Sequence, residues 1–225
     1  MRRWAYGTAA QQFVEVSGSG DLGVVLVHGG FWRAEKTVDS LHPVVEDLAG
    51  HGLVVGNAEY RTVDHGHEWP ACLDDVVEAT RCFGRATGVP LTRTVLIGHS
   101  AGGQLALLAA RSLPGLGGVV GLAALADLET AAADDLGEGA VAALGAEPAA
   151  VSPLRHPADT KVVLVHGDAD QTVPFAQSES YAAAWSARLV AVPGARHMHL
   201  VKPERPAWPV VRAEILSLTE ELSRG

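Results

Sequence analysis

The chain has 225 residues, of which 48% are hydrophobic and 19% are charged, and its formal net charge is −9. This length fits one domain with a sizeable core, and the composition is that of a globular protein, not of a disordered chain. The negative charge and the lack of a lysine or arginine run argue against a nucleic-acid surface. We therefore expect a single domain over residues 1–225 that does not bind nucleic acid.

Two further features concern the cellular compartment. The basic N-terminus lacks the apolar core of a signal peptide, and no apolar run approaches the ~20 residues of a membrane span. Cys72 and Cys82 lie in one predicted helix, roughly 15 Å apart, which is too far for a disulfide. Buried, reduced thiols suit a cytoplasmic protein, and we expect no contact with a membrane.

Hydrophobic periodicity and glycine or proline stop signals predict strands that alternate with helices along the chain. In the first half, the predicted strands cover residues 12–16, 23–27, 53–58 and 94–98. The predicted helices of this half cover residues 39–49 and 69–87 and a buried run that begins just after Ser100.

The second half continues the same alternation. Its predicted strands cover residues 119–125, 161–166 and 188–192, and its predicted helices cover residues 175–187 and 207–222. Residues 127–157 are rich in Ala, Gly, Asp and Glu and do not have the pattern of a sheet. The alternation indicates an α/β protein with a mostly parallel central sheet and helices on both faces.

A Gly-x-Ser-x-Gly motif, formed by Gly98, Ser100 and Gly102, lies where the strand at 94–98 turns into the next helix. A turn this tight strains the serine backbone, and the residues two positions away must lack side chains to let the backbone pass. The turn places the Ser100 hydroxyl at a helix N-terminus, where free N–H groups favour a developing anion. A glycine-rich turn that merely contains a serine has the same pattern, so the motif needs partners elsewhere.

Polar residues follow four predicted strands at the point where each strand ends: His28-Gly29-Gly30, Ser100, Asp170 and His197. In open α/β sheets these loops converge on the ligand crevice. A serine hydroxyl is a poor nucleophile unless an imidazole takes its proton and a carboxylate holds that imidazole. The chain order Ser, Asp, His is the order expected for a nucleophile on such a turn.

The acid and the base each have two candidates. Asp168 follows its strand directly, where Asp often tightens a turn, whereas Asp170 lies further into the loop and can reach a neighbouring loop. We therefore favour Asp170. His197 and His199 both follow the last strand, and the residues alone do not separate them, although His197 lies nearer the strand end.

Other histidines have simpler interpretations. His99 adjoins Ser100 but must point the opposite way across the strand end, so we expect it to be packed. His65 and His67 resemble a metal pair, yet they lie in a polar loop without an obvious third ligand. We therefore predict no metal site, and the serine chemistry needs no cofactor.

A tetrahedral intermediate carries an oxyanion, which backbone N–H donors stabilise by ~3 kcal/mol each. Ala101, directly after the serine, supplies one donor, and the loop His28-Gly29-Gly30-Phe31 can supply others because adjacent glycines expose N–H groups. Phe31, Trp32 and Tyr60 lie on loops at or near the same edge, so we predict Trp32 and Tyr60 as walls of the substrate pocket.

Over nearly its whole length the chain resembles the α/β-hydrolase superfamily, and within it the kynurenine formamidase (arylformamidase)-like hydrolases and related esterases. Four motifs in chain order carry the resemblance: His28-Gly29-Gly30-Phe31-Trp32, Gly98-His99-Ser100-Ala101-Gly102-Gly103, His166-Gly167 with Asp170 and Val173-Pro174-x-x-Gln177-Ser178, and His197-Met198-x-Leu200-Val201-x-Pro203 with Pro206-Ala207-Trp208. The resemblance implies an α/β-hydrolase fold, here with a minimal cap because residues 127–157 offer little to build one.

The same resemblance implies a role for each candidate residue: the nucleophile Ser100, the acid Asp170 and the base His197, with an oxyanion hole from the amides of Gly30, Phe31 and Ala101. The implied function is a serine hydrolase that cleaves a small amide or ester through an acyl-enzyme, foremost an arylformamidase with an N-formylkynurenine-type substrate. A short-acyl carboxylesterase is the alternative, and a non-catalytic binding module is a third hypothesis. The expected partners are a small-molecule substrate and, for assembly, a second copy in a homodimer.

Overall fold

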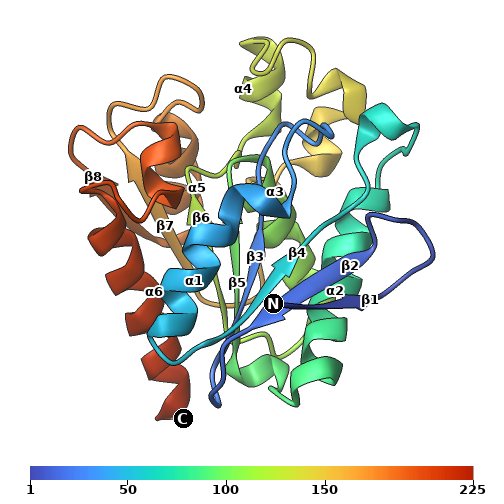
Figure 1. The fold of residues 1–225 in the computed structure, drawn as a ribbon. Helices are drawn as coiled ribbons and strands as arrows, with labels where there is room; N and C mark the ends of the chain where they lie inside the picture. The colour runs from blue at the N-terminus through green and yellow to red at the C-terminus, as the bar shows by residue number, and fades with distance from the viewer. Residues whose placement is uncertain (225) are drawn as a thin grey trace.

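An eight-stranded sheet forms the centre of the computed structural model, which describes residues 1–224 (Figure 1). Its strand order is β1-β2-β4-β3-β5-β6-β7-β8. The bounds are β1 Arg2–Ala5, β2 Phe13–Ser17, β3 Gly23–Val27, β4 Val54–Ala58, β5 Thr94–His99, β6 Gly118–Leu122, β7 Val162–Gly167 and β8 Arg188–Val192. Neighbours from β4 onward in this order run parallel, whereas β1 and β2, and β2 and β4, pair antiparallel. The mostly parallel sheet predicted from the sequence is confirmed.

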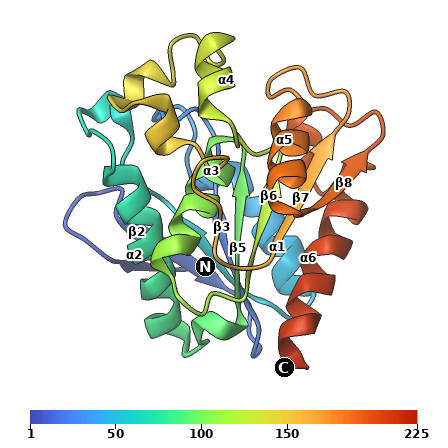
Figure 2. The ribbon, with the colours of Figure 1, turned by 180° about the vertical axis from the view of Figure 1, so that it is seen from behind.

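Helices cover both faces of this sheet. α1 (His42–Gly50) and α6 (Trp208–Ser223) lie on the face seen in Figure 1, and α2 (Ala71–Thr87), α3 (Ala101–Ala109) and α5 (Ala176–Trp185) lie on the face seen in Figure 2. Each face has its own cluster of buried apolar side chains, which explains why the central strands are continuous apolar runs. Among residues 1–224, none of the helices has the length and apolar character that crossing a membrane requires.

The predicted elements differ from the structure mainly at one edge strand and one strand end. The strand β1 escapes prediction because three of its four residues are exposed, so it has no buried period to detect. The predicted strand 119–125 ends earlier, at Leu122, because Ala123 has a φ of 45° and turns the chain out of the sheet. This turn brings the N–H of Leu125 to the carbonyl oxygen of Ser100, at 3.3 Å.

The segment 127–157 forms a small cap, although its sequence offers little to build one. It contains the short helix α4 (Leu128–Ala133) and 3₁₀ turns, and it lies beyond the carboxyl ends of the strands (Figure 1). Arg33 Nη2 donates a hydrogen bond to the carbonyl oxygen of Glu138 at 2.8 Å, and a Cβ on Gly137 would meet the Phe31 ring at 2.5 Å. The cap therefore packs on the loop that follows β3.

The two cysteines are both unpaired and buried, and both lie in α2. Burial raises the pKa of the Cys72 thiol to about 12, so this thiol stays protonated near neutral pH. The expectation that Cys72 and Cys82 form no disulfide with each other is confirmed.

Candidate active site

Ser100 lies at the tight turn between β5 and α3, with a φ of 57° and a ψ of −121°. Such a backbone is unfavourable for a residue with a Cβ, so the surrounding structure must hold it. A Cβ on Gly98 would lie 2.1 Å from the carbonyl oxygen of Gly102, and a Cβ on Gly102 would lie 2.3 Å from that of Val27. Only glycine at both positions lets α3 pack this closely on β5 and β3, which explains the spacing of the motif.

The carboxylate of Asp170 and the imidazole of His197 form a close pair, with 2.7 Å between Oδ2 and Nδ1. The second oxygen, Oδ1, accepts hydrogen bonds from the N–H groups of Thr172 at 2.8 Å and Val173 at 3.0 Å. The Asp170 side chain is 0% exposed, and that of His197 is 11% exposed. Because Nδ1–H faces the carboxylate, the free lone pair of the neutral imidazole lies on Nε2, which a general base requires.

A second histidine, His166 at the end of β7, also supports Asp170. Its Nε2 donates to the carbonyl oxygen of Val173 at 3.0 Å and lies 3.4 Å from Asp170 Oδ2, while Nδ1 accepts from the Ser178 hydroxyl at 2.7 Å. Burial by itself raises the pKa of Asp170, but hydrogen bonds from His166 and His197 outweigh burial and hold that pKa well below its usual range. The carboxylate therefore stays ionised.

The sequence interpretation gave His166 no role, although the residue belongs to one of the motifs that carried the resemblance. The available signal was a histidine at the end of an apolar strand, four residues before the favoured acid. His166 lies in β7 and Asp170 lies in the loop that follows. Strand periodicity ends where the strand ends, so it does not predict which loop side chain contacts His166, and only the folded loop shows the contact with Asp170.

The structure separates the competing candidates by their hydrogen bonds. Asp168 Oδ1 accepts from the N–H of Gly194 at 2.6 Å, so this carboxylate ties β7 to the turn after β8. His199 Nδ1 accepts from the N–H of Arg196 at 3.2 Å and closes the short 3₁₀ turn His197–Val201. Asp170 and His197 are thus brought together, whereas Asp168 and His199 stabilise the loops that carry them.

Ser100 and His197 line the same cavity, which has a volume of about 270 Å³. The loop after β3 contributes Gly29, Gly30 and Phe31 to its wall, and the apolar side chains are Leu41, Met198 and Val201. The cavity is small and mainly apolar, and its polar lining side chains are Lys36, Ser40, His99, Ser100, Thr172 and His197. This arrangement is typical of a site for a small substrate.

His99 is packed, as the sequence predicts, but it also forms part of this cavity. Its Nε2 donates to the carbonyl oxygen of His197 at 3.2 Å, and the two imidazole rings lie 4.5 Å apart. Burial lowers the pKa of His99 to about 3, with a further contribution from the neighbouring His197. His99 is therefore neutral near pH 7 and adds no positive charge beside the predicted base.

The predicted oxyanion hole lies where the loop after β3 meets the start of α3. Within residues 1–224, the backbone N–H groups of Gly30, Phe31 and Ala101 donate no hydrogen bond. Phe31 and Trp32 have φ values of 52° and 59°, so this loop is held in an unfavourable conformation, like Ser100. The unpaired donors beside the serine are what stabilisation of an oxyanion requires.

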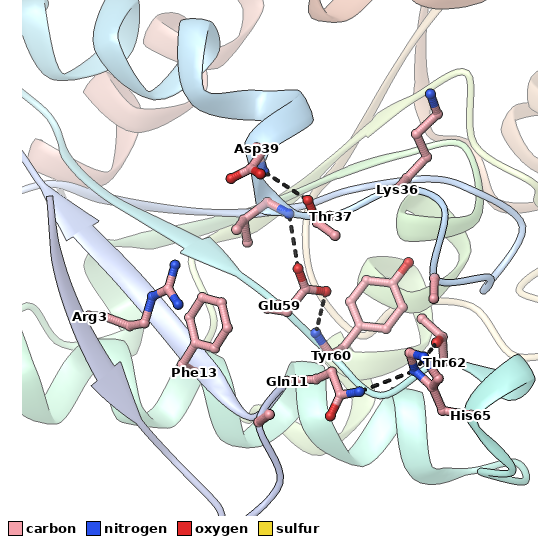
Figure 3. A pocket seen from close by; sticks show the side chains of 13 residues that line it. Arg3, Gln11, Phe13, Lys36, Thr37, Asp39, Glu59, Tyr60, Thr62 and His65 are labelled. Carbon is pink, nitrogen blue, oxygen red and sulfur yellow. Dashed lines mark hydrogen bonds between the residues drawn. The ribbon is translucent and has the colours of Figure 1, made fainter.

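The buried side chains of His28, Glu59 and Tyr60 support the loop that follows β3. The imidazole of His28 is 0% exposed, with Nδ1 donating to the carbonyl oxygen of Gly29 at 2.8 Å and Nε2 lying 2.9 Å from Glu59 Oε1. The Glu59 carboxylate also accepts from the N–H groups of Val38 and Tyr60, at 3.0 and 3.1 Å (Figure 3). Both ring nitrogens of His28 are thereby occupied, so this pair supports the loop and leaves no nitrogen for catalysis.

The structure corrects the predicted pocket walls. Trp32 is 0% exposed and its indole N–H donates to Gln104 Oε1 at 3.1 Å, so it packs in the core. Tyr60 stacks on the His28 ring at 4.4 Å, donates its hydroxyl to the His28 carbonyl oxygen, and borders a second cavity (Figure 3). Neither ring lines the Ser100 cavity, because both pack beneath the loop that follows β3. Phe31, in the same loop, does line the cavity.

In the loop that contains His65 and His67, the contacts of His65 are hydrogen bonds to neighbouring polar side chains. Gln11 Nε2 donates to His65 Nδ1 at 3.1 Å, and the Thr62 hydroxyl lies 3.3 Å from the same nitrogen. In the described part of the chain, no three His, Cys, Asp or Glu side chains come together as metal ligands would.

The strand order, the helices on both faces and the strained serine turn at the carboxyl edge define an α/β-hydrolase fold. The comparisons with solved structures agree. Thermogutta terrifontis esterase 2 phosphonylated by sarin has a TM-score of 0.80 and 23% identity, covering 98% of this chain and 92% of that chain. Its butyrate-bound form has a TM-score of 0.77 and 24% identity over the same shares.

A third solved structure, from Silicibacter sp. tm1040, has a TM-score of 0.78 and 23% identity and covers 93% of this chain and 83% of that chain. The family model described as BD-FAE matches residues 17–114, which include Ser100 but stop before Asp170 and His197. No curated protein sequence matches the chain. At these sequence identities the structural likeness establishes the fold alone, and the evidence for an activity lies in the geometry of the site.

Proposed function

We propose that the chain is a serine hydrolase that cleaves a small carboxylic ester through an acyl-enzyme. The observation that carries this proposal is the close pair of Asp170 and His197, whose imidazole lines the same cavity as Ser100. A serine on a strained turn, a histidine held through Nδ1 and a buried ionised carboxylate together make up the apparatus of nucleophilic acyl transfer.

In the first half of the reaction, Ser100 Oγ attacks the ester carbonyl carbon while His197 Nε2 accepts the hydroxyl proton. Asp170 stabilises the resulting imidazolium and keeps its Nδ1–H oriented, because its own pKa lies far below neutral. The oxyanion of the tetrahedral intermediate accepts hydrogen bonds from the unpaired N–H groups of Gly30, Phe31 and Ala101. His197 then passes its proton to the leaving alcohol, and the acyl group stays on Ser100.

In the second half, water takes the place of the alcohol. His197 Nε2 removes a proton from that water as it attacks the acyl-enzyme, and the same N–H groups stabilise the second oxyanion. Collapse of this intermediate releases the carboxylic acid and returns the proton to Ser100. No step requires a group outside the protein, the substrate and water.

The choice of substrate rests on the cavity and on the relatives. A volume of about 270 Å³ favours a short acyl group, and the T. terrifontis relative has been solved with butyrate and with propionate bound. An arylformamidase uses the same apparatus, and its support is the resemblance of the His28-Gly29-Gly30-Phe31-Trp32 motif. Because Trp32 packs in the core and not in the cavity, we place the short-acyl ester first.

The test compares hydrolysis of p-nitrophenyl butyrate and N-formylkynurenine by the wild-type chain and by Ser100→Ala. We expect the butyrate ester to have the larger kcat/KM and Ser100→Ala to abolish its turnover while the melting temperature stays unchanged. A larger kcat/KM for the formamide, lost in the same variant, would identify an arylformamidase. Full activity in Ser100→Ala contradicts the role of Ser100 as nucleophile. No turnover of either substrate by the wild-type chain contradicts the proposal and favours a binding module.

A further inference from the structure

Two cavities lie next to each other at the loop after β3, and a single side chain borders both. The first is the Ser100 cavity, and the second, of about 290 Å³, lies over Glu59 and Tyr60 between the chain's N-terminal strands and residues 34–39 (Figure 3). Of residues 1–224, Lys36 alone lines both of them. A substrate that extends from Ser100 towards the second cavity therefore passes Lys36.

The backbone that carries Lys36 is anchored on both sides. The N–H of Ala34 donates to the Asp64 carboxylate at 2.9 Å, and the N–H of Val38 donates to Glu59 Oε2 at 3.0 Å. The aliphatic part of Lys36 packs on Gly30, since a Cβ on that glycine would lie 2.7 Å from Lys36 Cβ and 2.9 Å from Cγ. The side chain of Lys36 thus packs against the loop whose N–H groups are the predicted oxyanion donors.

The ammonium group itself has no partner. No carboxylate of residues 1–224 lies within 4.0 Å of Lys36 Nζ, and Figure 3 shows this group directed away from Asp39 and Glu59. The other cation of the second cavity, Arg3, is paired with Glu15 at 2.8 Å. Lys36 thus supplies a positive charge at the junction of the two cavities in a chain whose formal net charge is −9.

The Ser100 cavity contains no other fixed charge. Apart from Lys36, its wall consists of glycines, apolar and hydroxyl side chains and the histidines His99 and His197, and burial keeps His99 neutral. An anionic group of a bound molecule would meet one positive charge and no negative one. Electrostatic complementarity of this kind selects among substrates more than it increases their overall affinity.

We propose that Lys36 binds a carboxylate group of the substrate, so that the preferred esters are anionic. This inference rests on the proposed function, because it names the substrate class of the same site. The carboxylate belongs to the acyl chain or to the leaving alcohol, at the end of the substrate that lies between the two cavities. Lys36 determines specificity and takes no part in proton transfer.

The test uses three aryl esters: phenyl butyrate, the nearly isosteric monophenyl succinate with a carboxylate on the acyl chain, and 4-(butyryloxy)benzoate with a carboxylate on the leaving group. After subtraction of uncatalysed hydrolysis, kcat/KM for each anionic ester is divided by that for phenyl butyrate. In Lys36→Met we expect this ratio to fall about fivefold for one of the anionic esters, as for a solvent-accessible ion pair. The ester that responds identifies the position of the carboxylate.

Three controls sharpen this measurement. Lys36→Arg keeps the charge and should retain most of the preference. Lys161→Met removes the same charge at an exposed site, where the lysine pairs with Glu221, and should leave the ratio as in the wild-type chain. Raising the ionic strength to 1 M, where the Debye length is about 3 Å, should shrink the preference of the wild-type chain. An identical ratio in the wild-type chain and Lys36→Met for both anionic esters overturns the proposal.

A binding measurement separates this inference from the proposed function. Monophenyl succinate and 4-(butyryloxy)benzoate are titrated calorimetrically into Ser100→Ala, with Lys36 present or replaced by Met. We expect the dissociation constant of one anionic ester to rise about fivefold on loss of the lysine. If the wild-type chain hydrolyses no ester, the proposed function fails, and the calorimetry still decides whether Lys36 binds the carboxylate.

Discussion

Two histidine–carboxylate pairs lie in the loops at the carboxyl edge of the sheet, and their nitrogen–oxygen distances are nearly the same. His197 and Asp170 are 2.7 Å apart, and His28 and Glu59 are 2.9 Å apart. They differ in the second nitrogen of the imidazole. His28 gives its Nδ1–H to the carbonyl oxygen of Gly29, whereas His197 keeps Nε2 free at the wall of the cavity that contains Ser100.

A histidine–carboxylate pair is therefore not by itself a catalytic site. In both pairs the carboxylate is held by backbone N–H groups, two on Asp170 and two on Glu59. The two pairs differ in the surroundings of the second ring nitrogen: in His28 it is bonded to a backbone carbonyl, and in His197 it lies at the cavity. Replacing residues of the Asp170–His197 pair should therefore change activity as well as stability, whereas replacing residues of the His28–Glu59 pair should act mainly on stability.

The largest expected effect is on activity. His197→Ala should lower kcat/KM for p-nitrophenyl butyrate by about 10⁴-fold or more, because the other imidazole of the cavity, His99, has a pKa lowered to about 3 by burial and is too weak a base to replace it. The free energy of unfolding, measured by urea denaturation, should fall only modestly, because Asp170 loses one partner but keeps the N–H groups of Thr172 and Val173 and the contact with His166. A loss of activity below tenfold would contradict the role of His197 as base.

The second effect is on stability. His28→Leu should lower the free energy of unfolding by about 3 kcal/mol, because it leaves the Glu59 carboxylate buried without its imidazole partner. Urea denaturation measures this loss. Adding Glu59→Gln to His28→Leu should recover part of it, and purely additive losses in this double-mutant cycle would contradict a coupled pair.

The third effect is a pH dependence on the catalytic side. The pKa of Asp170 is lowered in the folded protein, so the ionised carboxylate stabilises the fold above the ordinary Asp pKa of about 4. This stabilisation is lost as the pH falls through the lowered folded-state pKa. Asp170→Asn should thus be less stable than the wild-type chain by about 2 kcal/mol at pH 7, and the gap should narrow below pH 4.

Thermal unfolding between pH 7 and pH 2.5 measures this gap. Asp21→Asn, at an exposed carboxylate without a partner within residues 1–224, controls for the loss of one negative charge. A gap of constant size across this pH range would show that Asp170 is not held in its ionised form by the fold.

The smallest expected effect concerns His166, which connects Asp170 to Ser178. His166→Leu should lower kcat by about tenfold with little change in KM, since Asp170 loses one of its donors but keeps His197. His166→Gln, which retains an N–H donor, should recover part of the loss. Equal losses of kcat in both variants, with an unshifted pH profile, would indicate a merely structural role.

Much of the fold was predictable because its signals are local. The buried strands β3 and β5 are continuous apolar runs, and Gly98, Ser100 and Gly102 carry the geometry of their turn within five residues. The edge strand β1 was missed, since an exposed strand needs only a partner and not an apolar pattern. The end of β6 was missed because the left-handed Ala123 has no sequence signature.

The candidate site was predictable to the level of loops. Chain order and strand ends brought the loops of Ser100, Asp170 and His197 to one edge. The walls were not predictable in the same way, because Trp32 and Tyr60 lie on the expected loops and yet face the core. Which side of a loop an aromatic ring takes depends on the buried volume available, and that volume is set by residues distant in the chain, such as Gln104 for Trp32.

The sequence alone determined the α/β class, the strained serine turn and the set of polar loops at the carboxyl edge, because each follows from neighbouring residues. The residues favoured Asp170, and the resemblance implied both Asp170 and His197, but the contacts that distinguish them from Asp168 and His199 are visible only in the folded protein. Asp168 and Asp170, like His197 and His199, differ by two positions, and the backbone N–H of Gly194 and the imidazole of His197 choose between the two carboxylates. The physical reason is that hydrogen bonds act over about 3 Å between loops that are far apart in the chain.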